Sequence, residues 1–183
     1  GLVQGDEASR RLNRAAFPYE PATVDYLLVT HAHMDHIGRI AKLVKDGFKG
    51  KIISTPETRD IARLELDDAV KILATEAKNE GVLPLYELKD VDAAFSLWQT
   101  VGYHIKKDLN EEVSIFMKDA GHILGSAMIE LTWNGEKVVF TGDLGNSPSI
   151  LLKDTEPITD AKYMIMESVY GDRNHPPKDE RKR

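Results

Sequence analysis

The stretch Val24-Asp25-Tyr26-Leu27-Leu28-Val29-Thr30-His31-Ala32-His33-Met34-Asp35-His36 joins an apolar run to a polar cluster. Its first half, 24–30, is rich in apolar and β-branched residues and has the length of a strand. Its second half contains four side chains that can bind a metal: His31, His33, Asp35 and His36. Imidazole nitrogens and carboxylate oxygens are both zinc ligands. The stretch therefore predicts a metal-binding turn between a strand and a helix.

These four side chains cannot all point at one tetrahedral ion. On a strand-to-helix turn, His31 and His33 can face one ion while Asp35 and His36 face a second. Such an arrangement suits a pair of metals ~3.5–4 Å apart that share a bridging hydroxide. The alternative interpretation is a run of solvated or capping polar residues, because Asp and His are common in loops. Four fixed residues at this spacing seldom match by chance, which favours the metal site.

Outward from this turn, helices alternate with strands before strands dominate. A helix is expected from Ile37 to Val44, a strand at 51–54, a long helix after Thr55-Pro56, and a shorter helix capped by Asp90. Strands are expected at 102–107, 113–117, 127–133, 137–141 and 163–166, with a hairpin turn at Asn134-Gly135 and a further helix from Pro176. This order predicts an α/β fold.

The composition is that of a globular domain with a core. The chain has 183 residues, a formal net charge of −6, 42% hydrophobic and 30% charged residues, and no cysteine. The absence of cysteine excludes disulfides and cysteine-ligated zinc, and the composition is unlike that of a long disordered chain. Apolar runs are far shorter than the ~18–20 residues of a membrane span, and residues 1–5 do not resemble a signal peptide. We therefore expect a cytoplasmic protein without a membrane partner.

Three further residues follow predicted strands or lie between them. His122 is flanked by Gly121 and Gly125, and Asp143 by two glycines at the end of a strand. Glu167 ends the next strand. Taken alone, each has an ordinary interpretation as a loop or turn residue. Beside the first cluster, His122 becomes a third imidazole for the first metal, and Asp143 a carboxylate that could bridge both.

The remaining histidines and a basic stretch carry weaker signals. We interpret His104 as a structural residue within a strand and assign no role to His175. The basic residues Arg39, Lys42, Lys45, Lys49 and Lys51 lie close together in the sequence, with Asp46 among them. Such stretches usually form a solvated helix face, and nucleic-acid binding is the alternative.

Together these motifs resemble the metallo-β-lactamase superfamily. The resemblance rests on His31-x-His33-x-Asp35-His36, Gly121-His122, and Thr141-Gly142-Asp143-Leu144-Gly145. Glu167-Ser168-Val169-Tyr170-Gly171 is similar to the first β-CASP motif, which narrows the resemblance to RNA-processing nucleases related to the cleavage and polyadenylation specificity factor endonuclease. Val169 replaces the threonine usual in that motif.

The resemblance implies an αβ/βα sandwich that holds two zinc ions. His31, His33 and His122 would hold the first zinc, Asp35 and His36 the second, and Asp143 would bridge them. Asp35 would also orient the attacking hydroxide, and Glu167 would orient the histidine of a later motif that protonates the leaving oxygen. The implied domain organisation is that residues 1–183 are the N-terminal portion of the fold, with one mixed sheet and flanking helices, and without the β-CASP insertion and the C-terminal half.

The activity implied by the resemblance is cleavage of RNA phosphodiester bonds by a metal-bridged hydroxide, with single-stranded RNA as substrate and endonucleolytic cutting. Two other readings remain. One is a hydrolase of the same fold acting on lactam, lactone or ester bonds, because an activated hydroxide does not itself choose between phosphorus and carbonyl carbon. The other is a metal-binding fragment that lacks catalytic competence.

Overall fold

The computed structural model describes residues 1–145, 149 and 151–173. The helices are α1 (Glu7–Arg14), the 3-10 helix η1 (Pro21–Thr23), α2 (Met34–Ile37), α3 (Ile40–Lys45), α4 (Pro56–Glu80) and α5 (Leu88–Ser96). The strands are β1 (Tyr26–Leu28), β2 (Lys51–Ser54), β3 (Trp98–Thr100), β4 (Lys107–Asp108), β5 (Val113–Asp119), β6 (Ala127–Trp133), β7 (Glu136–Phe140) and β8 (Tyr163–Ile165). The α/β class is confirmed. His175 and the helix expected from Pro176 lie outside the described residues.

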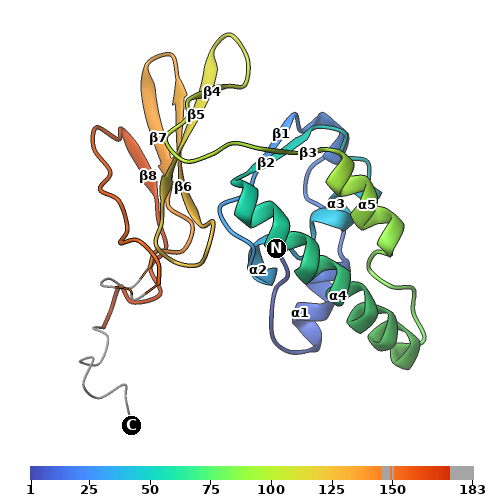
Figure 1. Ribbon diagram of the computed structural model, residues 1–183. Coiled ribbons are helices and arrows are strands. Elements are labelled where there is room, and N and C mark those ends of the chain that lie inside the picture. The colour runs from blue at the N-terminus through green and yellow to red at the C-terminus, as the bar shows by residue number, and fades with distance from the viewer. Residues whose placement is uncertain (146–148, 150, 174–183) are drawn as a thin grey trace.

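The first three strands form a parallel sheet in the order β1-β2-β3. Helices α2 and α3 connect the first pair of strands, and α4 and α5 connect the second, so the unit consists of two successive βαβ crossovers. Side chains of all four helices pack with Val29 and Ile52 in one apolar cluster. The helices therefore form a layer on one face of this sheet (Figure 1).

Strand β2 is buried on both faces. The consecutive residues Ile52 and Ile53 are both inaccessible to solvent, yet Ile52 belongs to the cluster under the helices and Ile53 to a second cluster. Successive side chains of a strand point to opposite faces, which explains the division. The second cluster includes Ile115, Met117 and Ile129 from β5 and β6. The three-stranded sheet thus lies between the helices and a second sheet.

That second sheet has the order β4-β5-β6-β7-β8, antiparallel except for the parallel pair β7–β8. The expectation of one mixed sheet was wrong in this respect, because the strands divide between two sheets that pack face to face (Figure 1). The chain crosses between the sheets over residues 101–106, after β3 has paired with β2. The Ala127 amide donates to the Thr30 carbonyl at 2.8 Å and joins the two layers near the end of β1.

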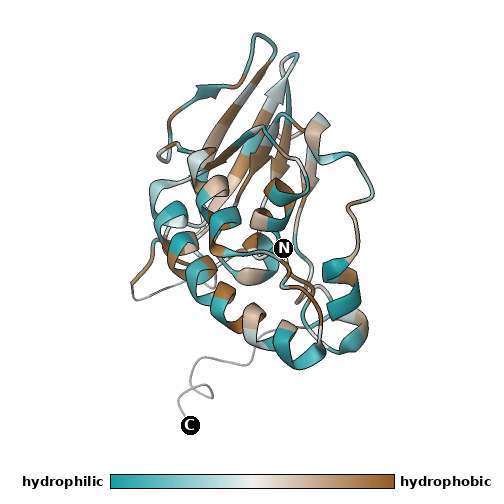
Figure 2. Cartoon of the chain, turned by 90° about the vertical axis from the view of Figure 1, so that its right-hand side faces the viewer, coloured by the Kyte–Doolittle hydropathy of each residue, from teal (hydrophilic) through white to brown (hydrophobic). Residues whose placement is uncertain are grey.

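Helix α4 follows its predicted signals closely. The Thr55 hydroxyl accepts a hydrogen bond from the Thr58 amide at 3.2 Å, Pro56 occupies the first turn, and Gly81 ends the helix with a φ of 68°. Leu66 and Ala77 of this helix are buried. Seen from the helix layer, the helices carry hydrophilic residues on the surface, and the strands behind them are largely hydrophobic (Figure 2).

Several expected boundaries were wrong for identifiable reasons. The helix expected from Ile37 to Val44 is divided into α2 and α3 at Gly38, where Leu2 packs so closely that a Cβ would lie 2.6 Å from its Cγ. The N-cap of α5 is Glu87, and Asp90 accepts a hydrogen bond from the Glu87 amide at 2.9 Å. Residues 102–106 of the strand expected at 102–107 lie in the connection between β3 and β4, and β4 begins at Lys107.

Helix α1 was not expected from the sequence. In α1, Asn13 is the buried residue, so apolar periodicity is absent from its sequence.

Two residues of the basic stretch pack against the segment that follows α1. Arg39 and Lys42 lie over the Phe17 ring, at 4.4 and 4.7 Å from its centroid. Lys42 is buried in an ion pair with Asp46. Arg39 and Lys42 therefore hold the segment after α1 against α3, whereas Lys45, Lys49 and Lys51 of the same basic stretch are exposed.

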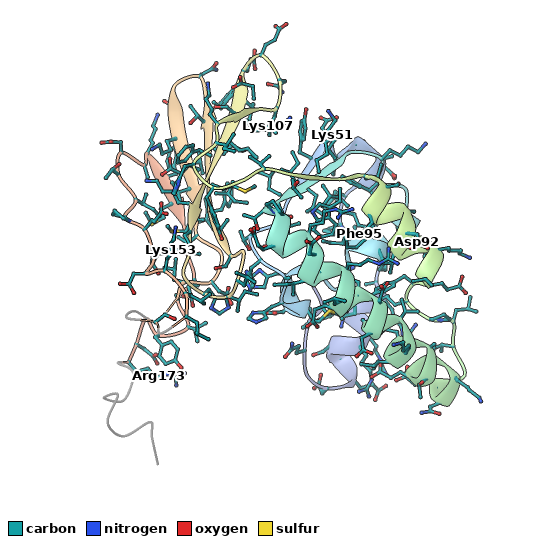
Figure 3. All side chains as sticks on the ribbon, in the orientation of Figure 1. Lys51, Asp92, Phe95, Lys107, Lys153 and Arg173 are labelled. Carbon is teal, nitrogen blue, oxygen red and sulfur yellow. The ribbon has the colours of Figure 1, made fainter. Side chains whose placement is uncertain are left out.

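Helices α4 and α5 are also linked by charge and aromatic contacts. Arg63 of α4 bonds to Asp92 at 2.8 Å, and its guanidinium lies 5.2 Å from the ring centroid of Phe95. Both partners belong to α5 (Figure 3). Phe95 in turn stacks on Trp98, which is the first residue of β3. Within the described residues, no helix is both long and apolar enough to cross a membrane.

Candidate dinuclear metal centre

The site begins at the carboxyl end of β1, the edge of a parallel sheet where ligand sites form. His31 follows this strand, is fully buried, and has its Nδ1 3.2 Å from the Thr30 hydroxyl. His33 is the N-cap of α2, which places Asp35 and His36 in the helix itself. The close approach of the Thr30 hydroxyl to Nδ1 leaves Nε2 of His31 directed into the site.

One group of ligand atoms combines His31, His33, His122 and Asp143. Nδ1 of His33 lies 3.1 Å from Nε2 of His31 and 3.1 Å from Nε2 of His122. Oδ2 of Asp143 lies 3.8 Å from Nε2 of His31 and 3.7 Å from Nε2 of His122. Residues up to 112 positions apart in the chain, from both sheets, are therefore close enough to hold one ion.

A second group lies on the other side of Asp143. Nε2 of His36 is 3.2 Å from Oδ1 of Asp143 and 3.6 Å from Oδ2 of Asp35. The two carboxylate oxygens of Asp143 are thus divided, with Oδ1 facing His36 and Oδ2 facing His31 and His122. Asp143 therefore lies between the two groups, and the six predicted metal ligands lie close together.

The environment of His31 and His122 favours their neutral imidazole form. Burial, followed by repulsion from His36, His122 and His33, lowers the pKa of His31 from 6.5 to about 3. Burial also lowers the pKa of His122, although the nearby Asp143 carboxylate opposes this shift. Because a metal binds the neutral imidazole, both shifts reduce the competition from protons at neutral pH.

Glu167 lies close to the cluster but does not belong to either ligand group. Its Oε1 accepts a hydrogen bond from the Leu144 amide at 2.5 Å, and its own amide donates to the Thr141 hydroxyl at 3.3 Å. Both contacts brace the turn that carries Asp143. Glu167, His122 and Asp143 line a pocket of about 790 Å³, whose wall also includes Met166, Val169 and Tyr170.

His104 lies outside this site and outside any strand. It has a φ of 60° in the connection before β4, and its Nε2 lies 2.8 Å from Oε1 of Glu156. A structural role was expected for it, but within a strand, and that placement was wrong. The contact with Glu156 joins the connection between the sheets to the segment that follows the Asp143 turn.

Comparison with known protein families gives a clear result. The model of the metallo-beta-lactamase superfamily matches residues 5–177. The chain belongs to this superfamily. The match spans the cluster at His31–His36, the His122 loop and the Asp143 turn, so the family assignment and the site geometry concern the same residues.

Curated relatives narrow the resemblance. The chain is 34% identical over 177 residues to "Ribonuclease TTHA0252" of Thermus thermophilus, which covers 97% of this chain and 38% of the relative. It is 33% identical over 165 residues to "Endoribonuclease YSH1" of Yarrowia lipolytica, covering 89% and 20%. It is 35% identical over 159 residues to "Transcription termination factor FttA" of Pyrococcus horikoshii, covering 82% and 23%. The resemblance to RNA-processing nucleases is confirmed, and the chain spans under two fifths of each relative.

The sequence did not reveal the groups that support the ligands. Thr30, Thr55, Thr58 and Ser126 make hydrogen bonds to a ligand or to the loops that carry the ligands. A hydroxyl residue beside a ligand is too common to be a signal by itself. The position of Ser126 after Gly125, within the motif that marks His122, was the one available indication.

Proposed function

We propose that this protein is a zinc-dependent hydrolase that binds two zinc ions and cleaves phosphodiester bonds of single-stranded RNA as an endonuclease. The observation that carries the proposal is the division of the two Asp143 oxygens between two groups of ligand atoms. A shared carboxylate is suited to two metals ~3.5–4 Å apart, an arrangement used for in-line displacement at phosphorus. The names of the relatives support RNA as the substrate.

The spacing of the donor atoms fits zinc. With zinc–nitrogen bonds of ~2.0–2.1 Å, the edges of a tetrahedron measure about 3.3–3.4 Å. The separations of 3.1 Å between ring nitrogens and of 3.7–3.8 Å to Asp143 lie on either side of this value. Three imidazoles and one carboxylate also form a donor set that zinc accepts. Bound zinc would lower the pKa of water to ~7 and offset charge on a phosphate.

The protein's own groups then have separate tasks. Asp35 has a side chain that is 50% exposed, so one of its oxygens can accept a hydrogen bond from the attacking water and orient it. Glu167 holds the turn around Asp143 through the Leu144 amide and is a positioning residue in this structure. Glu167 also lines the pocket in which the group that protonates the leaving oxygen can be oriented.

The pocket wall is suited to a nucleotide. Met166, Val169 and Tyr170 present apolar and aromatic surface beside the ligand cluster, and each is about half exposed or more. Unpaired bases stack on aromatic side chains with little dependence on sequence, at about 1–3 kcal/mol per base. A small lactam or ester would use less of this surface than a dinucleotide would.

The test is a substrate panel with the 183-residue protein supplied with zinc. We expect slow, metal-dependent cutting of internally labelled single-stranded RNA, because the second group has only three protein ligands. His33→Ala removes a ligand of the first group and should abolish most of the cutting. Lys107→Ala, which changes an exposed residue of β4 outside the site, is the matched control.

Each alternative has its own outcome in the same panel. Hydrolysis of a β-lactam, lactone or ester with intact RNA would overturn the ribonuclease proposal. Uptake of one zinc equivalent or none, with no hydrolysis of any substrate, would identify a metal-binding unit without catalytic competence. RNA cutting that His33→Ala leaves unchanged would refute the assignment of the site.

A further inference from the structure

The loop that carries His122 is closed around one hydroxyl. Oγ of Ser126 accepts hydrogen bonds from the His122 amide at 3.0 Å and from the Ile123 amide at 3.2 Å. The Ser126 amide donates back to the Ile123 carbonyl at 3.0 Å. These bonds fix the shape of the loop, but they are internal to it and do not place it relative to His31 and His33.

The first turn of α4 provides that external contact. The hydroxyls of Thr55 and Thr58 both donate to the Gly125 carbonyl, at 2.7 and 2.8 Å. Both threonines are fully buried. Only Thr55 has a capping function in α4, so capping does not explain the second hydroxyl. Two buried donors therefore saturate one buried acceptor across the boundary between the helix layer and the His122 loop.

The approach between the two segments depends on glycine. A Cβ on Gly125 would lie 2.6 Å from the Thr58 nitrogen and 2.8 Å from the Glu57 Cβ, and the φ of Gly125 is 82°. The start of α4 is itself fixed, because Ala62 and Leu66 of the same helix are inaccessible to solvent in the core. The Gly125 carbonyl is consequently held against a rigid element.

We propose that Thr55 and Thr58 are positioning residues for His122, and that they set the distance between the third imidazole and the two supplied by His31 and His33. His31 and His33 follow β1, whereas His122 precedes β6 of the other sheet. The threonine pair links these two halves beside the site, in addition to the bond from the Ala127 amide to the Thr30 carbonyl and the bond from the Tyr103 hydroxyl to the Ser126 carbonyl. The proposal rests on the metal-binding part of the proposed function.

The test measures cobalt(II) affinity, because the visible absorption of this ion reports its coordination number directly. Removing a supporting hydrogen bond of a metal ligand typically lowers metal affinity by about 10- to 100-fold. We expect a loss of this size for Thr58→Val at the tetrahedral site formed with His122. Thr58→Ser keeps the hydroxyl and should restore the affinity. Thr58→Ala, which adds no methyl beside the carbonyl, is a second variant if valine prevents folding.

A double-mutant cycle separates positioning from general stability. In a His122→Ala background, the imidazole that Thr58 positions is absent, so Thr58→Val should cause no further loss of cobalt affinity. The melting temperature of the metal-free protein is measured in parallel and should fall by the same amount in both backgrounds. An equal loss of cobalt affinity in both backgrounds, or unchanged affinity with a lower melting temperature, would overturn the proposal.

The outcomes also separate this inference from the proposed activity. If the wild-type protein binds cobalt and Thr58→Val binds it equally well, the positioning role is refuted while RNA cleavage is unaffected. If the cycle gives the expected coupling but no RNA is cut, the ribonuclease proposal is refuted and the positioning role stands. A wild-type protein that binds no cobalt would overturn both.

Discussion

Replacing Gly142 with alanine should damage both the fold and the metal site. Gly142 lies between Thr141 and the bridging residue Asp143 and has a φ of 55°. A Cβ at this position would lie 2.7 Å from the Thr30 Cβ and 2.8 Å from the Thr30 hydroxyl oxygen. That hydroxyl is the one beside Nδ1 of His31. The substitution therefore disturbs the neighbours of two predicted ligands at once.

The expected cost has two parts. A left-handed conformation costs a residue with a Cβ about 1–2 kcal/mol. Overpacking of a filled interior adds about 1–3 kcal/mol. The sum is about 2–5 kcal/mol, and a domain of this size loses about 2–4 °C of melting temperature per kcal/mol. We therefore expect Gly142→Ala to lower the melting temperature by about 4–20 °C, provided that the variant folds.

Gly135 offers a matched control within the same chain. Its φ is 76°, but nothing lies within 4 Å of the position that a Cβ would take. Gly135→Ala should therefore show the backbone cost alone, about 1–2 kcal/mol. The assays are thermal unfolding of the metal-free proteins by circular dichroism, and zinc affinity by competition with a chromophoric chelator.

The two variants should differ most in zinc affinity. Gly135→Ala should bind zinc as the wild type does, whereas Gly142→Ala should bind it at least about 10-fold more weakly, as changes to supporting groups do. Equal melting temperatures and equal zinc affinities for the two variants would refute the reasoning, because the contact with Thr30 would then have no consequence.

Three further predictions concern carboxylates. Asp143→Asn should reduce zinc binding from two equivalents to one, because the second group keeps only His36 and Asp35; elemental analysis that still finds two would contradict this. Burial opposes ionisation of Glu130, but Lys118 and Lys137 outweigh burial and lower the pKa of Glu130. The ionised carboxylate therefore stabilises the folded protein fully above the unfolded pKa of ~4.3, and this stabilisation is lost as the pH falls. Urea unfolding should thus show Glu130→Gln less stable by about 1.5–3 kcal/mol at pH 7 and by less at pH 3; a constant difference would be evidence against the charge effect. Glu167→Gln keeps an acceptor for the Leu144 amide and should retain zinc affinity, whereas Glu167→Ala should lose it; equal binding by both would exclude a bracing role.

The sequence predicted the elements whose signals are local. β2 and β6 have the expected bounds, and α4 has its expected cap and first-turn proline. The errors occur where distant residues meet. Leu2 packs against Gly38, where the helix expected from Ile37 to Val44 is divided, and the pairing of β3 with β2 ends before the strand expected at 102–107. Neither contact is visible in a window of neighbouring residues.

For the site, too, local sequence signals could be interpreted, whereas contacts between distant residues could not. Six ligand residues could be predicted because their spacing in the chain and their chemistry are distinctive, and the structure brings all six into two groups. The groups that hold them are Thr30, Thr55, Thr58 and Ser126, whose roles depend on contacts across the layers. The division into two sheets was likewise not predicted, since it depends on which strands share a ladder and not on the pattern within each strand.

The shared Asp143 carboxylate also has a thermodynamic consequence. An ion bound by the three-imidazole group and Asp143 would fix the orientation of this carboxylate, with Oδ1 toward His36. Loading of the two proposed positions would then be linked, and by reciprocity each ion would change the affinity for the other by the same factor. Titration with zinc should follow an ordered and cooperative curve, so a fit to two independent sites would give misleading affinities for both.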